Sequence, residues 1–295
     1  RKPGRQIEEL RHRHQKRMKR LDVLIKALPC KVFGPRNIEI YGISNDSRTV
    51  KKGDLFVAIT GANFDGHKFI PSAISKGAVA IVGEKDIDGL SIDKNITYIR
   101  VPNARYALSF IASSWYGHPS KKLKMVGVTG TDGKTTTATI IYWILKTAGK
   151  KVGLISTVSA RIGEDEYDTG FHVTNPEPIP LQRFLNLMVE KGCEWAVLEV
   201  TSHGLDQERV AGISFEASVL TNITHEHLDY HKSFSDYLKA KSKLFLSSKT
   251  SVLNENDSSF TKIKELIGSS SRIIPYDSES LKGKVKEAVL ERFPE

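Results

Sequence analysis

The segment from Lys124 to Gly149 constrains the fold more than any other part of the 295-residue chain. It begins with an apolar run, KMVGVTG, and continues through the glycine-rich turn TDGK. It ends in TTTATIIYWILKTAG, whose apolar spacing predicts an amphipathic helix that stops at Gly149. Phosphate-binding loops occur in this strand–loop–helix context. The segment therefore predicts an α/β domain with a nucleotide site at its loop.

The loop in this segment, GVTGTDGKTTT, departs by one residue from the strict phosphate-loop pattern G-x-x-x-x-G-K-[ST]. That pattern requires a glycine at position 128, where the chain has Val128, with Gly127 and Gly130 on either side. A plain strand-to-helix turn capped by threonine is the structural alternative. The sequence GKTTT directly after an apolar strand favours the nucleotide site.

The residue types of the loop suit the binding of a triphosphate. Glycines let backbone N–H groups approach an anion closely, and the helix N-terminus adds its partial positive charge. Lys134 can reach the β- and γ-phosphates, and the Thr135 hydroxyl can coordinate Mg²⁺. The predicted nucleotide-binding residues are Gly130, Thr131, Asp132, Gly133, Lys134, Thr135 and Thr136.

The pattern along the chain predicts alternating strands and helices. Strands are predicted at 53–59, 78–83, 97–101, 124–130, 151–157, 194–200 and 217–223. Helices are predicted at 21–28, 68–76, 103–117, 134–148 and 179–191. Strands separated by helices indicate a mostly parallel sheet with both faces covered. Two serine-rich stretches, SSKTS (247–251) and IGSSS (267–271), are interpreted as loops.

We therefore predict an α/β protein with two domains. A small N-terminal α/β domain covers 20–118, and a doubly wound, mostly parallel domain with a P-loop-type ATP site covers 119–295. The segment HPSKK (118–122) combines proline with charge and is interpreted as the linker between them. We expect the second domain to be incomplete at its C-terminal end.

The net charge of +10 belongs mainly to one short tail. Residues 1–20 carry +7 and the rest of the chain only +3, so residues 1–19 are interpreted as a basic, poorly ordered extension. The tail could bind RNA or anionic lipid, but it has no aromatic residue for base stacking, so no nucleic-acid partner is expected. No apolar run is long enough to span a membrane. With two cysteines, the chain suits a reducing cytoplasm, and we expect a monomer.

Two polar segments follow strands of the predicted second domain. Glu199 ends the strand EWAVLEV, and His227 lies in THEHLDYH after the strand ASVLTNI. Ligands of open parallel sheets bind beyond the carboxyl ends of the strands, so Gly130, Glu199 and His227 should converge. A glutamate and a histidine there could bind a hard cation beside the phosphates. The sequence His-Glu-His at 225–227 has no further thiolate ligand and makes a poor structural zinc site.

Four segments, taken together in this order and spacing, resemble the Mur ligase family. They are SNDSRTVKKGDLFVAITGANFDGHKFIPSAISKGAVAIVGE, GVTGTDGKTTT, LEVTSHGLDQERV and TNITHEHLDYHKSFSDYLKAKSKLF. Within the family the chain is similar to the UDP-N-acetylmuramoyl-tripeptide synthetases, which add the third amino acid of the peptidoglycan stem. The first segment separates this branch from folylpolyglutamate synthetase. The resemblance implies a cytoplasmic enzyme in which ATP activates a carboxylate as an acyl phosphate, which an amine then attacks.

The resemblance also implies roles for single residues. Lys134 would bind the β- and γ-phosphates, Thr135 and Glu199 would hold one Mg²⁺, and His227 would serve a second. Lys241, in KAKSKLF, matches a lysine that the family carbamoylates with CO₂. A carbamate is an anion and can bind Mg²⁺ where an ammonium would repel it. Without the resemblance, Lys241 would be interpreted as a solvated lysine on a helix face.

For the substrate, the resemblance implies UDP-MurNAc-L-Ala-D-Glu together with an amino acid, diaminopimelate or lysine. Ser47 could otherwise be a simple turn residue. Arg209 suits a carboxylate or phosphate because its guanidinium is planar and bidentate. The implied substrate-binding residues are Ser47, Ala62, Asn63, Phe64, Thr174, Asn175, Thr201, Gln207 and Arg209.

Family members carry a third domain that closes over the site, and the resemblance places it after the last residue here. We therefore expect these 295 residues alone to turn over poorly, because lid closure completes such sites. Two other functions remain open. One is a related ligase such as a folylpolyglutamate or cyanophycin synthetase. The other is a non-catalytic protein that binds a nucleotide or a UDP-sugar.

Overall fold

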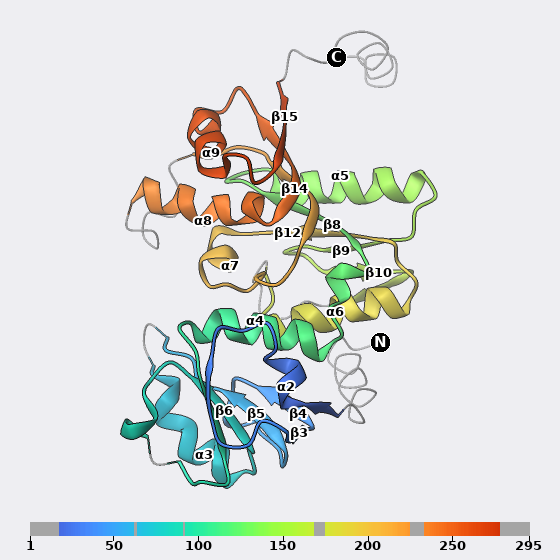
Figure 1. Cartoon of the computed structure of the whole chain (residues 1–295). Helices are drawn as coiled ribbons and strands as arrows, with labels where there is room; N and C mark the ends of the chain where they lie inside the picture. Colours follow the sequence, from blue (N-terminus) through green and yellow to red (C-terminus); the bar gives the residue numbers. More distant parts are fainter. Residues whose placement is uncertain (1–17, 62–63, 91, 168–174, 225–232, 278–295) are drawn as a thin grey trace.

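The computed structural model describes residues 18–61, 64–90, 92–167, 175–224 and 233–277. Figure 1 shows two separate sheets, one formed by the N-terminal part of the chain and one by the remainder, with helices α4 and α6 between them. A short antiparallel pair, β1 (Lys19–Arg20) with β3 (Glu39–Ile40), stands apart from both sheets. The two-domain α/β architecture predicted from the alternating pattern is present. The limits 20–118 and 119–295 stay a prediction.

The N-terminal sheet has five strands in the order β2-β7-β6-β5-β4. The bounds are β2 Lys31–Phe33, β4 Gly42–Ser44, β5 Asp54–Val57, β6 Ala80–Gly83, β7 Thr97–Arg100, α2 Leu21–Leu24, α3 Ile70–Ser75 and α4 Ala104–Trp115. Strands β4 to β7 are parallel, and β2 is antiparallel to β7. Successive residues of a strand point to opposite faces. Accordingly, Leu55 and Val57 pack with α2 and α4, whereas Phe56 and Ala58 pack with α3.

The second sheet has eight strands in the order β11-β10-β9-β12-β8-β13-β14-β15. The bounds are β8 Lys124–Thr129, β9 Val152–Ile155, β10 Ala160–Ile162, β11 Asp165–Tyr167, β12 Trp195–Glu199, β13 Phe215–Leu220, β14 Ser248–Asn254 and β15 Arg272–Tyr276. The six strands from β9 to β15 in this order are parallel, and β10 and β11 form an antiparallel edge. The sheet is therefore mostly parallel, as the pattern predicted.

Helices cover both faces of the second sheet (Figure 1). They are α5 Lys134–Thr147, α6 Pro178–Glu190, α7 Ser202–Asp206, α8 Phe234–Leu246 and α9 Phe260–Ile267. Val126 and Val128 of β8 pack with α5. Met125 of the same strand packs in a second core with residues of α6, α7 and α8. The alternation along β8 thus assigns the two faces to different helices.

One expectation about loops was wrong. SSKTS lies mostly within β14, an inner strand, because its small hydroxyl side chains fit a buried position when they find partners. Ser251 is fully buried, and its Oγ lies 2.8 Å from Ser271 Oγ and 3.5 Å from Ser218 Oγ. The segment HPSKK, interpreted as the linker between the domains, lies between α4 and β8. It forms a short 3₁₀ helix, Pro119–Lys121, in which Pro119 and Ser120 are buried.

Both cysteines of the chain lie within the described residues. Cys30 and Cys193 are both free thiols, and burial raises the pKa of each. Within the described ranges, no helix is long and apolar enough to cross a membrane.

An ionic cluster fixes the start of the 3₁₀ helix Gly66–Phe69 against β6. Asp65 accepts hydrogen bonds from the backbone N–H of His67 at 3.0 Å and from Lys85 Nζ at 2.6 Å. The buried His67 contacts Asp65 through Nδ1 at 2.7 Å and accepts the Glu84 N–H at Nε2 at 3.0 Å. Lys85, with the N–H groups of His67, holds the pKa of the Asp65 carboxyl well below its usual range.

We predict that Asp65→Asn lowers the free energy of unfolding at pH 7 by about 1 kcal/mol. The folded-state pKa of Asp65 lies below that of the unfolded chain, so its contribution is present above about pH 4 and is lost as the pH falls. Urea unfolding of both proteins from pH 7 to pH 3 should show the difference shrinking below about pH 4. The exposed Asp93 provides a control, since Asp93→Asn should show no such difference. A difference that stays constant with pH would contradict this assignment.

Candidate functional site

The candidate site lies at the carboxyl ends of three neighbouring strands of the second sheet. Strand β8 lies between β12 and β13 and is parallel to both. The pairing register aligns Glu199 of β12 with Val128 of β8, and Leu220 of β13 with Thr129. The segments that follow these strands therefore meet at one edge of the sheet, where ligands bind in open parallel sheets.

The loop between β8 and α5 requires glycine at two positions. Gly133 has φ 73° in the left-handed region and directly precedes α5. At Gly130, a Cβ atom would collide with Thr221 Oγ1. Both residues belong to the predicted phosphate loop. The first-turn N–H groups of α5 have no acceptor within the helix, so the helix presents donors at this end.

The segment after β13 holds the loop in shape. Thr131 N–H donates to Asn222 O at 2.8 Å, and Asp132 N–H donates to Asn222 Oδ1 at 2.9 Å. Thr221 Oγ1 donates to Asp132 O at 2.6 Å. Thr221 and Asn222 were not predicted as site residues. Their position directly after a strand of the same sheet is the signal that could have found them.

Glu199 connects the loop to two more strands. Its side chain is 1% exposed, and Oε1 accepts hydrogen bonds from Thr135 Oγ1 at 2.9 Å and Thr157 Oγ1 at 3.0 Å. Oε2 accepts the Thr157 N–H at 3.0 Å. Thr157, which follows β9, was missed by the sequence analysis. Thr135 and Glu199 thus present adjacent hard oxygen donors, a donor set that fits Mg²⁺. His227, also predicted to bind a metal, lies outside the described residues.

The remaining loop side chains differ in exposure. Lys134 is half-buried, and its Nζ donates to Thr131 O at 2.6 Å, so the ammonium lies over the loop. Asp132 and Thr136 are exposed, whereas Thr131 is buried. The part of the chain that the structure describes contains no group of three or more His, Cys, Asp or Glu side chains that could hold a metal.

Lys241 reaches the loop from α8. It is 1% exposed, its Nζ donates to Gly130 O at 2.7 Å, and it lies 4.7 Å from the centre of the Tyr237 ring. The Tyr237 hydroxyl lies 3.1 Å from Thr131 Oγ1. The interpretation of Lys241 as a solvated lysine is therefore wrong, because the helix directs it inward. Tyr237 was missed, since an aromatic residue on an amphipathic helix looks like ordinary core.

A second cluster begins at the backbone of Glu199. Asn175 is 1% exposed, and its Nδ2 donates to Glu199 O at 2.7 Å. Its Oδ1 accepts from Thr201 N–H at 2.8 Å and from Thr201 Oγ1 at 2.9 Å. Thr201 in turn caps α7 by accepting the Gly204 N–H at 3.0 Å. Thr174, the other predicted residue of this segment, lies outside the described residues.

Arg209 extends this cluster. Its Nη1 donates to Asn175 O at 2.7 Å, and its Nε and Nη2 donate to Gln207 Oε1 at 3.1 and 2.8 Å. Nη2 also pairs with Glu177 at 2.9 Å. Four of the predicted substrate-binding residues, Asn175, Thr201, Gln207 and Arg209, thus form one hydrogen-bonded group beside the loop.

Of the four predicted residues in the N-terminal domain, the structure describes two. Ser47 is 9% exposed and follows β4, whereas Phe64 is 74% exposed and follows β5. Because β4 and β5 are parallel neighbours, both residues lie at one edge of that sheet. Ala62 and Asn63, predicted to join them, lie outside the described residues.

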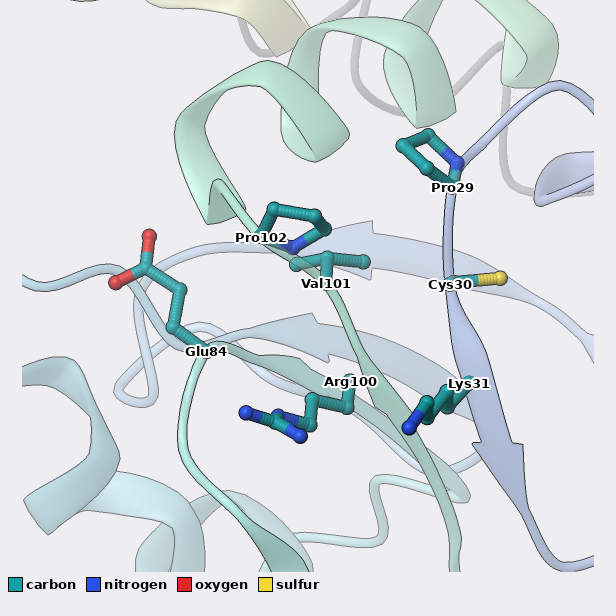
Figure 2. Close-up of a pocket in the computed structure, with 7 residues that line it drawn as sticks. All are labelled: Pro29, Cys30, Lys31, Glu84, Arg100, Val101 and Pro102. Carbon is teal, nitrogen blue, oxygen red and sulfur yellow. The ribbon is translucent and has the colours of Figure 1, made fainter.

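The same edge carries a pocket with a volume of about 480 Å³ (Figure 2). Its walls follow β6 and β7 and include the start of β2. Figure 2 shows the Lys31 and Arg100 side chains on one side of the pocket, away from the apolar Pro29, Val101 and Pro102. Arg100 also pairs with Asp86 at 2.7 Å. None of these residues was predicted as a site residue, since their types match no binding motif.

Two protein-family models match this sequence. The Mur ligase middle domain matches residues 128–295. The model described as "Mur ligase family, catalytic domain" matches residues 39–116.

Similar curated proteins carry the name UDP-N-acetylmuramoyl-L-alanyl-D-glutamate–2,6-diaminopimelate ligase. The protein from Parabacteroides distasonis is 48% identical over 214 residues, which cover 72% of this chain and 43% of that protein. The protein from Bacteroides fragilis is 41% identical over 283 residues, which cover 93% and 56%. The chain spans about half the length of the curated relatives it matches.

Solved structures show the same fold. A structure with that ligase name superposes with a TM-score of 0.74 at 24% identity, covering 90% of this chain and 53% of the other. MurF from Acinetobacter baumannii superposes with a TM-score of 0.58 at 21% identity, covering 88% and 53%. At these identities, the comparison supports the fold alone.

We predict that Gly130→Ala lowers the free energy of unfolding by about 1–3 kcal/mol, because the new methyl group overpacks against Thr221. The double variant Gly130→Ala/Thr221→Ala should recover part of the loss. Gly133→Ala is the matched control, since its Cβ would meet no atom within 4 Å and only the backbone conformation disfavours it. Thermal unfolding of the four proteins measures these differences. Equal destabilisation of the single and double variants would contradict the steric explanation.

Proposed function

Since the chain belongs to the Mur ligase family, we propose that it serves an ATP-dependent ligation in peptidoglycan synthesis. The proposed reaction joins an amino acid to UDP-MurNAc-L-Ala-D-Glu. The observation that carries the proposal is the meeting of the phosphate-type loop, Glu199 and Lys241 at one edge of the sheet. The names of the relatives from P. distasonis and B. fragilis favour 2,6-diaminopimelate as the added amino acid. We further propose a cytoplasmic monomer, where ATP and the UDP-linked precursor are both available.

Each group at the loop has a defined task in this proposal. The Lys134 ammonium would turn from Thr131 O to the terminal phosphates, and the first-turn N–H groups of α5 would bind phosphate oxygens. Thr135 and Glu199 would hold Mg²⁺, which neutralises charge on the phosphates when it is bound. Thr157 would keep the Glu199 carboxylate oriented through its two hydrogen bonds. These contacts would hold the γ-phosphoryl group for transfer to a substrate carboxylate.

The proposed reaction has two steps, activation of the substrate carboxylate and attack by the amine. Transfer of the γ-phosphoryl group to the carboxylate gives an acyl phosphate and ADP. The amine of the incoming amino acid then attacks the acyl carbon, and the tetrahedral species collapses to the amide with release of phosphate. Preorganised donors such as Lys134 stabilise the charge that develops during these steps.

Lys241 suits conversion to a carbamate. A neutral amine would add to CO₂ to form –NH–COO⁻ with loss of a proton, which replaces a positive by a negative group. The carbamate retains one N–H, so the hydrogen bond to Gly130 O can persist. Its oxygen atoms would then serve the second predicted metal position with His227.

Asn175, Thr201, Gln207 and Arg209 are proposed to bind the UDP-linked substrate, with Ser47 and the 62–64 turn on the N-terminal domain. Arg209 already offers its guanidinium to a carboxylate, that of Glu177, which a substrate carboxylate or phosphate could replace. The connection from Arg209 through Asn175 to Glu199 links this cluster to the phosphate loop.

The proposed function can be tested by phosphate release from the full-length gene product. Release should require ATP, UDP-MurNAc-L-Ala-D-Glu and an amino acid, with diaminopimelate and lysine compared directly. Lys134→Ala should lower kcat by about a thousandfold or more, because a charge-stabilising donor is lost. Lys146→Ala on the same helix is the control and should retain activity. A Lys134→Ala protein of nearly normal rate would overturn the loop assignment, and ATP binding without any turnover would favour a binding protein.

A second test concerns Lys241. We predict that Lys241→Ala abolishes activity and that added short carboxylates restore part of it, because they replace the missing anion. The control is Lys239→Ala, which changes an exposed lysine of the same helix and should leave the rate unchanged. Full activity of Lys241→Ala without any added carboxylate would rule out the carbamate.

A further inference from the structure

Glu208 occupies a backbone position that normally belongs to glycine. It follows the C-terminus of α7 with φ 58° in the left-handed region. The Arg209 N–H donates to Gly204 O at 2.8 Å, and the Glu208 N–H donates to Leu205 O at 3.2 Å. This is the Schellman motif, in which glycine is the usual residue at the left-handed position. A non-glycine residue in this conformation is strained, so we expect contacts of Glu208 that compensate for the strain.

The contacts of Glu208 join three elements. Its Oε1 accepts a hydrogen bond from Lys243 Nζ of α8 at 2.6 Å, in an ion pair that is partly shielded from solvent. Its carbonyl oxygen accepts a hydrogen bond from Ser109 Oγ at 2.5 Å. Ser109 is fully buried and belongs to α4 of the N-terminal domain. One residue therefore connects the N-terminal domain, the end of α7 and α8.

The ion pair also bears on the orientation of Lys241. Two residues of an α-helix span about 200° of rotation, so Lys241 and Lys243 leave α8 on opposite sides. Lys241 is bound to Gly130 O on one side, and Lys243 is bound to Glu208 on the other. Because α8 is held by a lysine on each of two opposite sides, it cannot rotate about its axis without breaking one of these contacts. The Glu208–Lys243 pair thus holds Lys241 toward the loop.

A pocket with a volume of about 550 Å³ borders the pair. Most of its lining comes from α4, from the 205–214 segment and from α8. Because side chains do not fill this space, close packing contributes less here to holding the three elements together. The polar contacts of Glu208 therefore contribute more to holding these three elements together. The residues on either side of it, Gln207 and Arg209, belong to the substrate cluster described above.

We propose that Glu208 is a positioning residue that couples the N-terminal domain to α8 and to the cluster formed by Gln207 and Arg209. Its effect on catalysis rests on the proposed ligase function. The mechanical coupling does not, since it is a property of the ligand-free protein. Glu208 touches neither the phosphate loop nor Lys241 directly, and it acts through Lys243, Ser109 and its chain neighbours.

The first test is hydrogen–deuterium exchange of the ligand-free protein. Glu208→Gln keeps the shape and the backbone carbonyl but removes the charge. It should raise the exchange rates of amides in 207–212 and α8 about five- to tenfold. Lys243→Gln should have the same effect, and the double variant should be no worse than either single variant. Glu216→Gln is the control, because it removes an exposed ion pair between β13 and β14, with Lys249, that involves no residue of α8 or of 207–212.

The second test separates positioning from general instability in the full-length gene product. Glu208→Gln should raise KM for UDP-MurNAc-L-Ala-D-Glu about tenfold and lower kcat, while KM for ATP stays unchanged. A merely unstable protein would lose kcat with both KM values unaltered. Unchanged exchange in α8, or additive effects of the two single variants, would overturn the proposal. Absence of ligase activity in the wild-type protein would refute the proposed function, and the exchange data would still decide the coupling.

Discussion

The candidate site depends on the hydrogen bonds that the buried carboxylate of Glu199 accepts. A carboxylate with 1% exposure is tolerated only when hydrogen bonds compensate for the lost water, and here Thr135 and Thr157 supply them. Those donors come from the start of α5 and the end of β9. The backbone carbonyl of the same residue accepts from Asn175, so the loop and the substrate cluster meet at one side chain. Moving Glu199 would disturb both.

The parallel sheet explains how residues from distant parts of the chain meet at one site. Parallel strands bring the segments after β8, β9, β12 and β13 to a common edge, although these segments are far apart in sequence. Helices return the chain along the faces, and α8 sends Lys241 back to Gly130 at that edge. The N-terminal domain repeats the principle on a smaller scale, with Ser47 and Phe64 after adjacent strands. Contacts between α4 and the segment after α7 then connect the two domains.

Strands and helices with strong apolar periodicity could be predicted from the sequence, because burial of one face imposes that spacing. All seven predicted strands are present, and the phosphate-type loop lies where its glycines indicated. Strand β14 could not be found in this way. Its central Ser251 is buried between Ser218 of β13 and Ser271 after α9, and these hydroxyl groups meet only in the assembled sheet. Thr157 and Tyr237 could not be predicted as site residues either, because threonine is common in turns and tyrosine is common in cores.

The sequence by itself determined the identity of the loop, the class of fold and the residue types available at the site. The sequence provides Gly130, Gly133, Lys134 and Glu199, and local sterics explain why glycine is needed at the first two positions. Only the tertiary structure decided which of these groups meet and in what environment. Lys241 illustrates the difference, since helical spacing allows a solvated or a buried side chain equally. Its burial against Gly130 follows from how α8 packs on the sheet, a long-range arrangement that no local pattern encodes.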